Sequence, residues 1–252
     1  MSYALSAKAL SEFKDHVIAC YPEEACGFVI GDEFHPVKNS SPEPLTTFHV
    51  APIDYVKAEA LGVIQAFLHS HPYSKFDPPK WPSEWPSAHD MRYWMDGTIP
   101  WGIVGTDGEG LTDMVWLDDS LPPLVGRDFV HGVRDCYGLI RDWFRVNKQI
   151  DIPNFARSME WWFTGEDLYE KNFAEVGFAP IDLKDAVIGD CVMMKVASPV
   201  TNHAAVITGP NEILHHMFHR LSGADRLDKW KRHIVRAVRY VGRPNEKNSP
   251  LP

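Results

Sequence analysis

The sequence predicts an α/β (α+β) protein with two domains, and three observations support this. The 252 residues are 44% hydrophobic and 12% aromatic, enough to bury more than one core. Segments with the helical period alternate with short segments that have the two-residue period of strands. Between them, 118–129 contains two prolines and no clear periodicity. We therefore expect one domain in 1–120, a linker in 121–127, a second domain in 128–243 and a disordered tail in 244–252.

Composition excludes several classes of function. The formal net charge of -9 argues against general binding to nucleic acid or to anionic membranes. No apolar run is long enough to cross a membrane, so we expect no membrane insertion. The first twenty residues carry charges throughout and do not resemble a secretory signal. With four cysteines and no such signal, we expect reduced thiols and synthesis in a cytoplasm.

The first domain is expected to begin with a helix over 6–19, because apolar residues recur there at helical spacing and Ser6 can cap the start. A short strand then ends at Gly31. The further expected elements are a helix over 54–61, a strand over 63–68, a helix that starts after Ser87, and strands over 101–106 and 113–117 joined by a DGEG turn.

The second domain is expected to open with a helix that has Cys136 at or near its N-terminus. Leu139, Ile140, Trp143 and Phe144 share one face of that helix. The later expected elements are a helix over 166–176, a half-buried strand over 189–196, and a hairpin in which NHAAVIT and EILHH flank the turn GPN.

The stretch 69–90, HSHPYSKFDPPKWPSEWPSAHD, predicts a metal site. If the apolar run before it is a strand, alternation puts His69 and His71 on one face, where both imidazoles can reach one ion. Ser87 is placed to cap the next helix, with Asp90 in its first turn. Two histidine nitrogens and one carboxylate oxygen, with a fourth position left to water, are typical of a catalytic zinc site.

Two residues complete this candidate. Glu24, just before the neighbouring strand, is the expected base for a zinc-activated water, and Ser87 can donate a hydrogen bond to the oxyanion. The alternative is that HSH is a pair of polar loop residues and that Ser87 and Asp90 form only a capping box. The complete set, with a strand before it and a helix after it, favours the metal site.

The segments EACG, HSHP and PSAHD resemble the JAB1/MPN/Mov34 metalloenzymes, which hydrolyse isopeptide or related amide bonds with Zn²⁺. The resemblance implies a mixed-sheet domain with Glu24 as general base, Ser87 as oxyanion partner, and His69, His71 and Asp90 as metal ligands.

One feature departs from that family's pattern. Fifteen residues, 72–86, separate the second histidine from the serine, whereas the family usually has about ten. Trp81 and Trp85 in this insertion either form a rim of the substrate groove or are ordinary packing residues.

The second candidate site consists of Cys136, His203 and His215. A helix N-terminus and a nearby imidazolium both lower the pKa of a thiol, as nucleophilic catalysis requires. In the expected hairpin, alternation pairs His203 with His215, so that His203 is the base and His215 orients it. The alternatives are a buried structural cysteine and a chance histidine pair. Cys20, Cys26 and Cys191 have no such partners and are interpreted as packing residues.

The segments DCYGLIRDW, NHAAV and ILHH resemble the NlpC/P60 cysteine peptidases, which have a papain-like fold and cut peptide bonds of the bacterial cell wall. The resemblance implies Cys136 as nucleophile, His203 as base and His215 as third residue. Tyr137 stands where the family usually has serine.

The order of the two domains, with VHGVRDCYGLIRDW and ILHHMFHRLS, resembles the tail-tip assembly proteins of lambda-like tailed phages. This implies peptidoglycan peptides and other tail-tip proteins as partners, and action of the virion tail tip at the cell wall. The basic run 226–243 is interpreted as a solvated face, with contact to acidic wall polymers or a tail partner as the alternative.

Three functions stay open from the sequence. One is a two-site hydrolase that combines a cysteine peptidase for stem peptides with a zinc amide hydrolase. Another is a structural or chaperone-like tail component with idle sites. The third is a cellular zinc isopeptidase.

Overall fold

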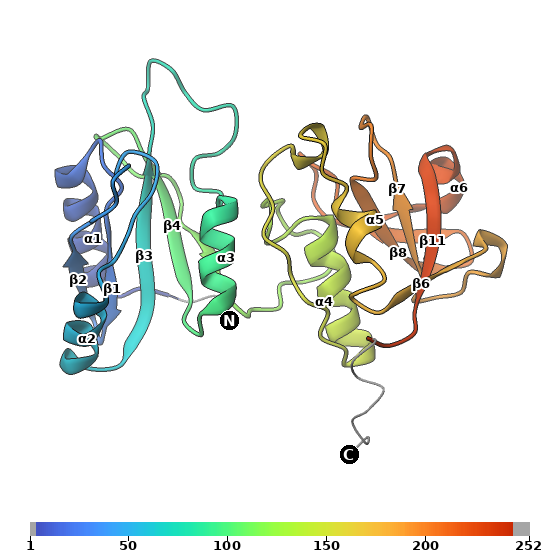
Figure 1. Cartoon of the computed structure of the whole chain (residues 1–252), viewed down its shortest axis with the longest axis horizontal. Coiled ribbons are helices and arrows are strands. Elements are labelled where there is room, and N and C mark those ends of the chain that lie inside the picture. The colour runs from blue at the N-terminus through green and yellow to red at the C-terminus, as the bar shows by residue number, and fades with distance from the viewer. Residues whose placement is uncertain (1–3, 244–252) are drawn as a thin grey trace. The chain divides into compact units, whose positions relative to one another are not determined.

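The chain forms two compact units, divided between Ser120 and Leu121. The computed structural model describes residues 4–243, so the tail expected at 244–252 lies outside the described residues. Each unit contains its own sheet together with helices, which confirms the predicted mixed α/β fold class (Figure 1). Within 4–243, no helix combines the length and the apolar character that crossing a membrane requires.

The first unit is built on a mixed sheet of five strands. Its elements in chain order are α1 (Ala7–Cys20), β1 (Cys26–Ile30), β2 (Glu33–Val37), α2 (Pro52–Leu61), β3 (Ile64–Pro72), α3 (Ala88–Asp96), β4 (Trp101–Thr106) and β5 (Val115–Leu117). The strand order is β2-β1-β3-β4-β5. Strands β3 and β4 run parallel, and the other neighbours are antiparallel.

Helix α1 covers one face of this sheet. Its start is capped as predicted, because the Ser6 hydroxyl accepts a 2.9 Å hydrogen bond from the Ala9 amide. Phe13 of α1 packs in one cluster with Ala66 and Leu68 of β3. Alternation along β3 therefore points its odd-numbered residues toward the opposite face, away from α1.

The second unit contains a sheet of six strands. Its elements are α4 (Cys136–Lys148), η1 (Trp161–Phe163), α5 (Leu168–Asn172), β6 (Phe178–Ile181), η2 (Leu183–Asp185), β7 (Cys191–Met194), β8 (His203–Gly209), β9 (Glu212–His215), β10 (Gly223–Arg226), α6 (Leu227–Trp230), η3 (Lys231–His233) and β11 (Ile234–Tyr240). The strand order is β10-β9-β8-β7-β11-β6, with antiparallel neighbours.

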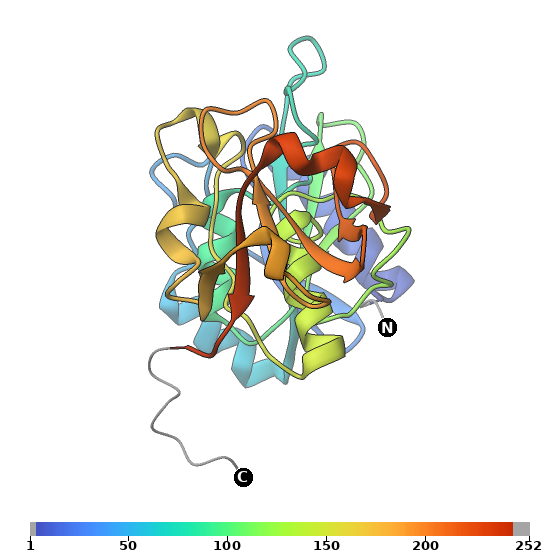
Figure 2. The same cartoon turned by 90° about the vertical axis from the view of Figure 1, so that its right-hand side faces the viewer.

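The two faces of this sheet carry different cores. Ala204, Val206 and Leu214 pack in one cluster with the apolar face of α4, which lies behind the orange and red strands in Figure 2. Alternate residues such as Ala205 and Ile213 pack in a second cluster with residues of α6. The hairpin of β8 and β9 forms as predicted, whereas the helix expected over 166–176 is only the short α5.

Candidate active sites

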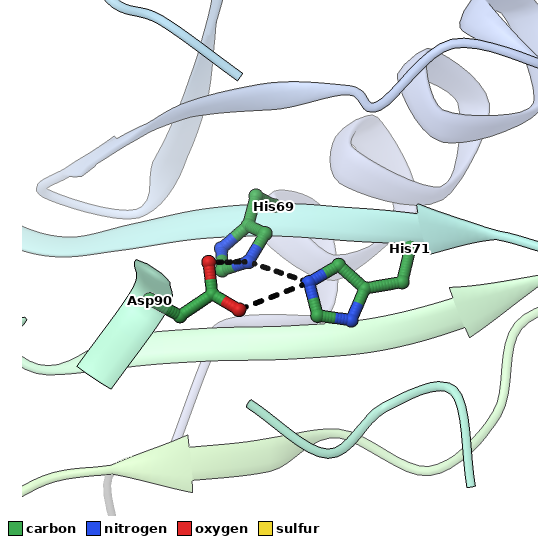
Figure 3. Close-up of side chains that lie close together, drawn as sticks. All are labelled: His69, His71 and Asp90. Atoms are coloured by element: carbon green, nitrogen blue, oxygen red, sulfur yellow. Dashed lines mark hydrogen bonds and ion pairs between the residues drawn. The ribbon is translucent and has the colours of Figure 1, made fainter. Parts of the chain in front are cut away.

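The end of β3 and the start of α3 bring three predicted metal ligands together (Figure 3). Nε2 of His69 lies 3.1 Å from Nε2 of His71. The carboxylate of Asp90 contacts both rings, with 3.3 Å from Oδ1 to His69 Nε2 and 3.3 Å from Oδ2 to His71 Nε2. His69 and Asp90 are almost fully buried, and His71 is partly exposed.

Asp90 is held by the helix that it helps to start. The Ser87 hydroxyl accepts a hydrogen bond from the Asp90 amide, and Oδ2 of Asp90 accepts hydrogen bonds of 2.7 Å from both the amide and the hydroxyl of Ser87. This is the capping box that the sequence offered as an alternative to a metal site. The structure contains the capping box and the ligand cluster at once. The Ser87 hydroxyl therefore donates its hydrogen bond to the Asp90 carboxylate in this structure.

The insertion 72–86 returns to the site and supports one ligand. Nδ1 of His71 donates a 2.6 Å hydrogen bond to the Ser83 carbonyl, which leaves Nε2 as the nitrogen free to bind a metal. Ser83 in turn packs against Gly105 of β4, where a Cβ would overlap its hydroxyl. His69 has no such support, because its Nδ1 is buried without a hydrogen-bond partner in the described residues.

Glu24 reaches the same site from the segment just before β1. The amide and carbonyl of Ala25 each make a 3.0 Å hydrogen bond to Ser70, the residue between the two histidines. Glu24 is 5% exposed, and burial is the main cause that raises its pKa to about 7. The charge of His71 opposes this shift, and the charge of Asp90 adds to it.

The donor set fits zinc. In a tetrahedral site with bonds of about 2.0–2.1 Å, neighbouring ligand atoms lie roughly 3.3–3.4 Å apart, close to the separations between His69, His71 and Asp90. Burial lowers the pKa of His69, which keeps that ring in its neutral, metal-binding form. Burial also acts to lower the pKa of His71, but the contacts with Asp90 raise it to about 9. The site therefore favours a positive charge at its centre.

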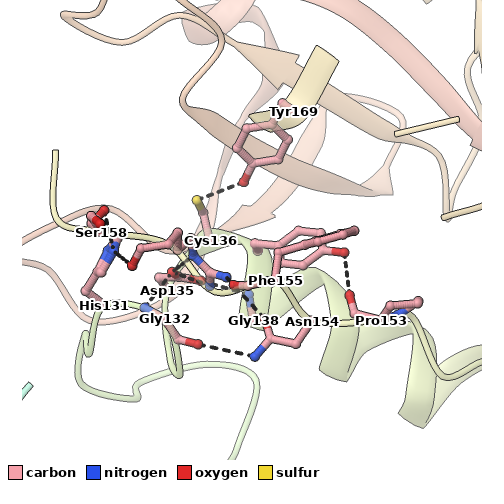
Figure 4. A network of polar contacts seen from close by, with 12 residues as sticks. His131, Gly132, Asp135, Cys136, Gly138, Pro153, Asn154, Phe155, Ser158 and Tyr169 are labelled. Atoms are coloured by element: carbon pink, nitrogen blue, oxygen red, sulfur yellow. Dashed lines mark hydrogen bonds and ion pairs between the residues drawn. The ribbon is translucent and has the colours of Figure 1, made fainter. Parts of the chain in front are cut away.

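In the second unit, Cys136 is the first residue of α4, as predicted. Asp135 caps this helix, because its Oδ1 accepts a 2.9 Å hydrogen bond from the Gly138 amide. Its Oδ2 accepts a 2.9 Å hydrogen bond from the Gly132 amide and a bidentate pair from the guanidinium of Arg157. The nucleophile candidate thus stands at a firmly capped helix N-terminus (Figure 4).

The thiol of Cys136 is enclosed. Its Sγ lies 3.2 Å from the Tyr169 hydroxyl of α5 (Figure 4). Burial is the main cause that raises the pKa of Cys136 to about 11, and the charge of Asp135 adds to this effect. The Ala204 amide of β8 also acts on the sulfur and opposes this rise in the pKa of Cys136. In this state the thiol is protonated at neutral pH.

His203 and His215 are brought together as predicted, with 3.0 Å between His203 Nε2 and His215 Nδ1. Trp230 packs against His215 at 4.8 Å between ring centroids. Burial, and then the charge of His215, lower the pKa of His203 to about 3. Within residues 4–243, no hydrogen bond joins Cys136 to either ring. The Cys136 sulfur nevertheless interacts with the amide of Ala204, which is the residue that directly follows His203.

Sequence reasoning missed three residues that support this site, which are Tyr137 of α4, Arg157 between α4 and α5, and Tyr169 of α5. The Tyr137 hydroxyl donates a 2.6 Å hydrogen bond to the Pro153 carbonyl, so the residue that departs from the usual serine fastens this segment to α4. Arg157 and Tyr169 contact Asp135 and Cys136 directly. No periodic pattern marks Arg157, and the helix expected over 166–176 contains Tyr169 without indicating its contact with Cys136. The motif departure at Tyr137 was the one signal available.

Comparisons with known proteins agree with two of the resemblances read from the sequence, to the NlpC/P60 peptidases and to the phage tail-tip assembly proteins. Residues 126–239 match the model of the NlpC/P60 family. Over 186 residues the chain is 36% identical to the tail tip assembly protein K of Escherichia phage lambda, which covers 73% of this chain and 85% of that protein. It is 33% identical over 241 residues to the tail tip assembly protein K of Escherichia phage N15, at 92% and 94% coverage.

Among solved structures, an NLP/P60-family lipoprotein-like protein from Staphylococcus aureus is similar with a TM-score of 0.32 and 20% identity, over 43% of this chain and 32% of that one. The relatives from phages lambda and N15 share sequence with this chain across most of their lengths. The chain therefore belongs to the family of the phage tail tip assembly protein K, and its second unit carries an NlpC/P60 peptidase-family domain.

Proposed function

We propose that this chain is a tail-tip assembly protein of a tailed phage and that its second unit is a cysteine peptidase for the stem peptides of peptidoglycan. The protein is made in the host cytoplasm, works with other tail-tip proteins and acts at the cell wall. The observation that carries the peptidase proposal is the pairing of His203 with His215, because His203 directly precedes Ala204, whose amide lies near the Cys136 sulfur.

In this proposal His203 is the general base. Its Nε2–H donates to His215, so its Nδ1 is the nitrogen that takes the proton from Cys136. The lowered pKa of His203 and the raised pKa of Cys136 make the resting pair neutral, so the proton moves as the sulfur attacks. An S–C bond forms, and the amide C–N bond breaks as His203 returns the proton to the leaving amine. Water then hydrolyses the thioester to the free carboxylate.

Zymography on purified cell wall tests the peptidase. The wild-type protein is expected to clear the wall and Cys136→Ala to leave it intact. Cys20→Ala is the matched control, since Cys20 is a partly exposed thiol of the first unit. Equal clearing by the wild type and Cys136→Ala would overturn the proposal.

A second activity is proposed for the first unit, a zinc-dependent hydrolase of amide or isopeptide bonds. The observation that favours it is the convergence of His69, His71 and Asp90 beside a buried carboxylic acid. Bound zinc would polarise the scissile carbonyl and activate water. Glu24 has a pKa of about 7, which suits a group that takes a proton from water and passes it to the leaving amine. Ser87 is exposed and remains the proposed donor to the oxyanion, a role that requires its hydroxyl to turn away from Asp90.

Metal analysis tests this second site. Purified wild-type protein is expected to hold about one zinc per chain, and His69→Ala and His71→Ala to lose it. His89→Ala is the matched control, because His89 lies on α3 and stacks on Tyr93, outside the ligand cluster. Absence of stoichiometric zinc from the wild type would count against the site.

The rival proposal is a structural or chaperone-like tail component with idle sites, and the enclosure of the Cys136 thiol by Tyr169 is the observation in its favour. Complementation of a tail-assembly defect by the double variant Cys136→Ala and Asp90→Asn separates the two. Normal assembly by a folded double variant would favour the structural role. A cellular isopeptidase would instead cleave ubiquitin-like conjugates and leave cell wall intact.

A further inference from the structure

Arg157 is a buried arginine whose position the proposed mechanism does not yet explain. It is 6% exposed, and its guanidinium donates to Oδ2 of Asp135 through Nε at 3.0 Å and Nη2 at 2.6 Å. Its Nη1 donates to Asn154 Oδ1 at 3.1 Å and to the Phe155 carbonyl at 2.7 Å. The guanidinium is therefore held at two of its edges, and two of its N–H groups bond the same carboxylate oxygen, Oδ2 of Asp135.

The partner of Arg157 stands next to the nucleophile. Asp135 caps α4, and a capping carboxylate is stronger than a neutral cap because it complements the positive end of the helix. The same negative charge is adjacent to Cys136, where it opposes formation of a thiolate. The negative charge that stabilises the helix start thus disfavours the Cys136 thiolate, unless a nearby positive charge balances it.

We propose that Arg157 is a positioning residue for the nucleophile, because its ion pair, with two hydrogen bonds to Oδ2, lets Asp135 cap α4 without opposing the Cys136 thiolate. This inference rests on the proposed peptidase function. The charged and titratable groups that face Cys136 or its cap are Asp135 on its own element, Tyr169 on α5, His203 on β8, Arg157, and His131, whose Nε2 donates to the Arg157 and Ser158 carbonyls. Arg157 is the permanent cation of this set.

The test measures the rate at which iodoacetamide alkylates Cys136 between pH 7 and 9, resolved from the other cysteines by peptide mass spectrometry. Arg157→Met is expected to slow alkylation by at least about tenfold, because an unmatched carboxylate shifts a neighbouring pKa by about one unit or more. The double variant Asp135→Asn with Arg157→Met is expected to recover most of the rate, and Arg157→Lys to lose less than Arg157→Met.

Arg127→Met is the matched control. Arg127 is also buried and pairs with Asp142 on the same helix, so its loss should destabilise the unit without changing the alkylation rate. An unchanged rate in folded Arg157→Met, or equal slowing in Arg127→Met, would overturn the proposal.

A second variant covers the case in which Arg157→Met does not fold. Asp135→Asn keeps a polar cap but leaves the arginine charge unmatched, so it is expected to alkylate about tenfold faster than the wild type, and an equal or slower rate would overturn the proposal. Alkylation needs no substrate. A protein that clears no cell wall but shows these rate changes would refute the peptidase and leave the role of Arg157 intact.

Discussion

His203 Nε2 lies 3.0 Å from His215 Nδ1, although the two residues belong to different strands of the β8–β9 hairpin. Both side chains lie on the sheet face that carries Trp230, which packs against them. The pairing fixes the orientation of His203 and leaves its other ring nitrogen for a reaction partner. In the proposed peptidase, His215 would act on the sulfur through His203.

Replacement of His215 should reduce peptidase activity without removing the nucleophile. His215→Ala is expected to lower kcat by on the order of 10²-fold, because His203 loses the acceptor that orients it. His215→Asn keeps an acceptor and should retain more activity. Steady-state kinetics on a stem peptide would check this. His216→Asn is the control, since His216 bonds the Arg220 carbonyl instead; equal losses in His216→Asn and His215→Ala would contradict the assignment.

Acid should destabilise the second unit through His203. The folded pKa is about 3 and the ordinary value is 6.5, so between these pH values the unfolded chain binds a proton that the folded chain does not. Stability is fully present above pH 6.5 and falls as the pH drops toward 3, by up to about 1.4 kcal/mol per pH unit.

Hydrogen exchange of the β8 and β9 amides, measured from pH 7 to 4, gives the stability of the second unit independently of the first unit. His203→Gln should flatten the dependence, while the slope due to His216, whose pKa burial lowers to about 4, remains. Identical slopes in the wild type and His203→Gln would argue against a buried neutral His203.

Local patterns were sufficient to predict that His69, His71 and Asp90 converge and that Cys136 lies at the start of a helix. His69 and His71 share a face because strands alternate, Asp90 joins them because Ser87 caps its helix, and the GPN turn sets the pairing of β8 with β9. The JAB/MPN-like identity of the first unit and the roles of these residues stay predictions.

Contacts from irregular segments could not be predicted in this way. Arg157 contacts Asp135 from a stretch with no period, and although Tyr169 lies in the helix expected over 166–176, only tertiary packing places its hydroxyl beside Cys136. Strand β2 was also not predicted from the sequence, because proline is rare within strands and β2 contains Pro36. The structure places β2 at the edge of the sheet, where the missing N–H of a proline is tolerated.

The segment 72–86 should support metal binding through the contact of its Ser83 with Gly105 of β4. Gly105→Ala would push Ser83 away and release Nδ1 of His71 from its carbonyl, so zinc affinity is expected to fall by about 10–100-fold. Gly110→Ala is the matched control, because a Cβ there meets nothing within 4 Å. Competition titration with a zinc chelator gives both affinities. Equal affinities for the two variants would show that the insertion does not support the ligand.

Tyr137 should contribute to stability in place of the usual serine. Tyr137→Phe removes the hydrogen bond to the Pro153 carbonyl and is expected to lower the free energy of unfolding by about 0.5–1.5 kcal/mol. Tyr21→Phe removes a 3.2 Å hydrogen bond to the Tyr73 carbonyl at a more exposed site, where water can replace it, and should cost less. Urea denaturation would compare them. A larger loss in Tyr21→Phe would contradict this ranking.

Asp90 uses one carboxylate for two tasks, since Oδ2 both accepts the capping hydrogen bonds of Ser87 and lies against His71. In the proposed metal site, ion binding and the formation of the first turn of α3 would therefore be thermodynamically linked. An ion that binds this carboxylate only in its folded arrangement must stabilise the first turn of α3. By reciprocity, any substitution that frays that turn must weaken the hold on the ion by the same free energy. Occupancy of the site would thus change the stability of the first turn of α3.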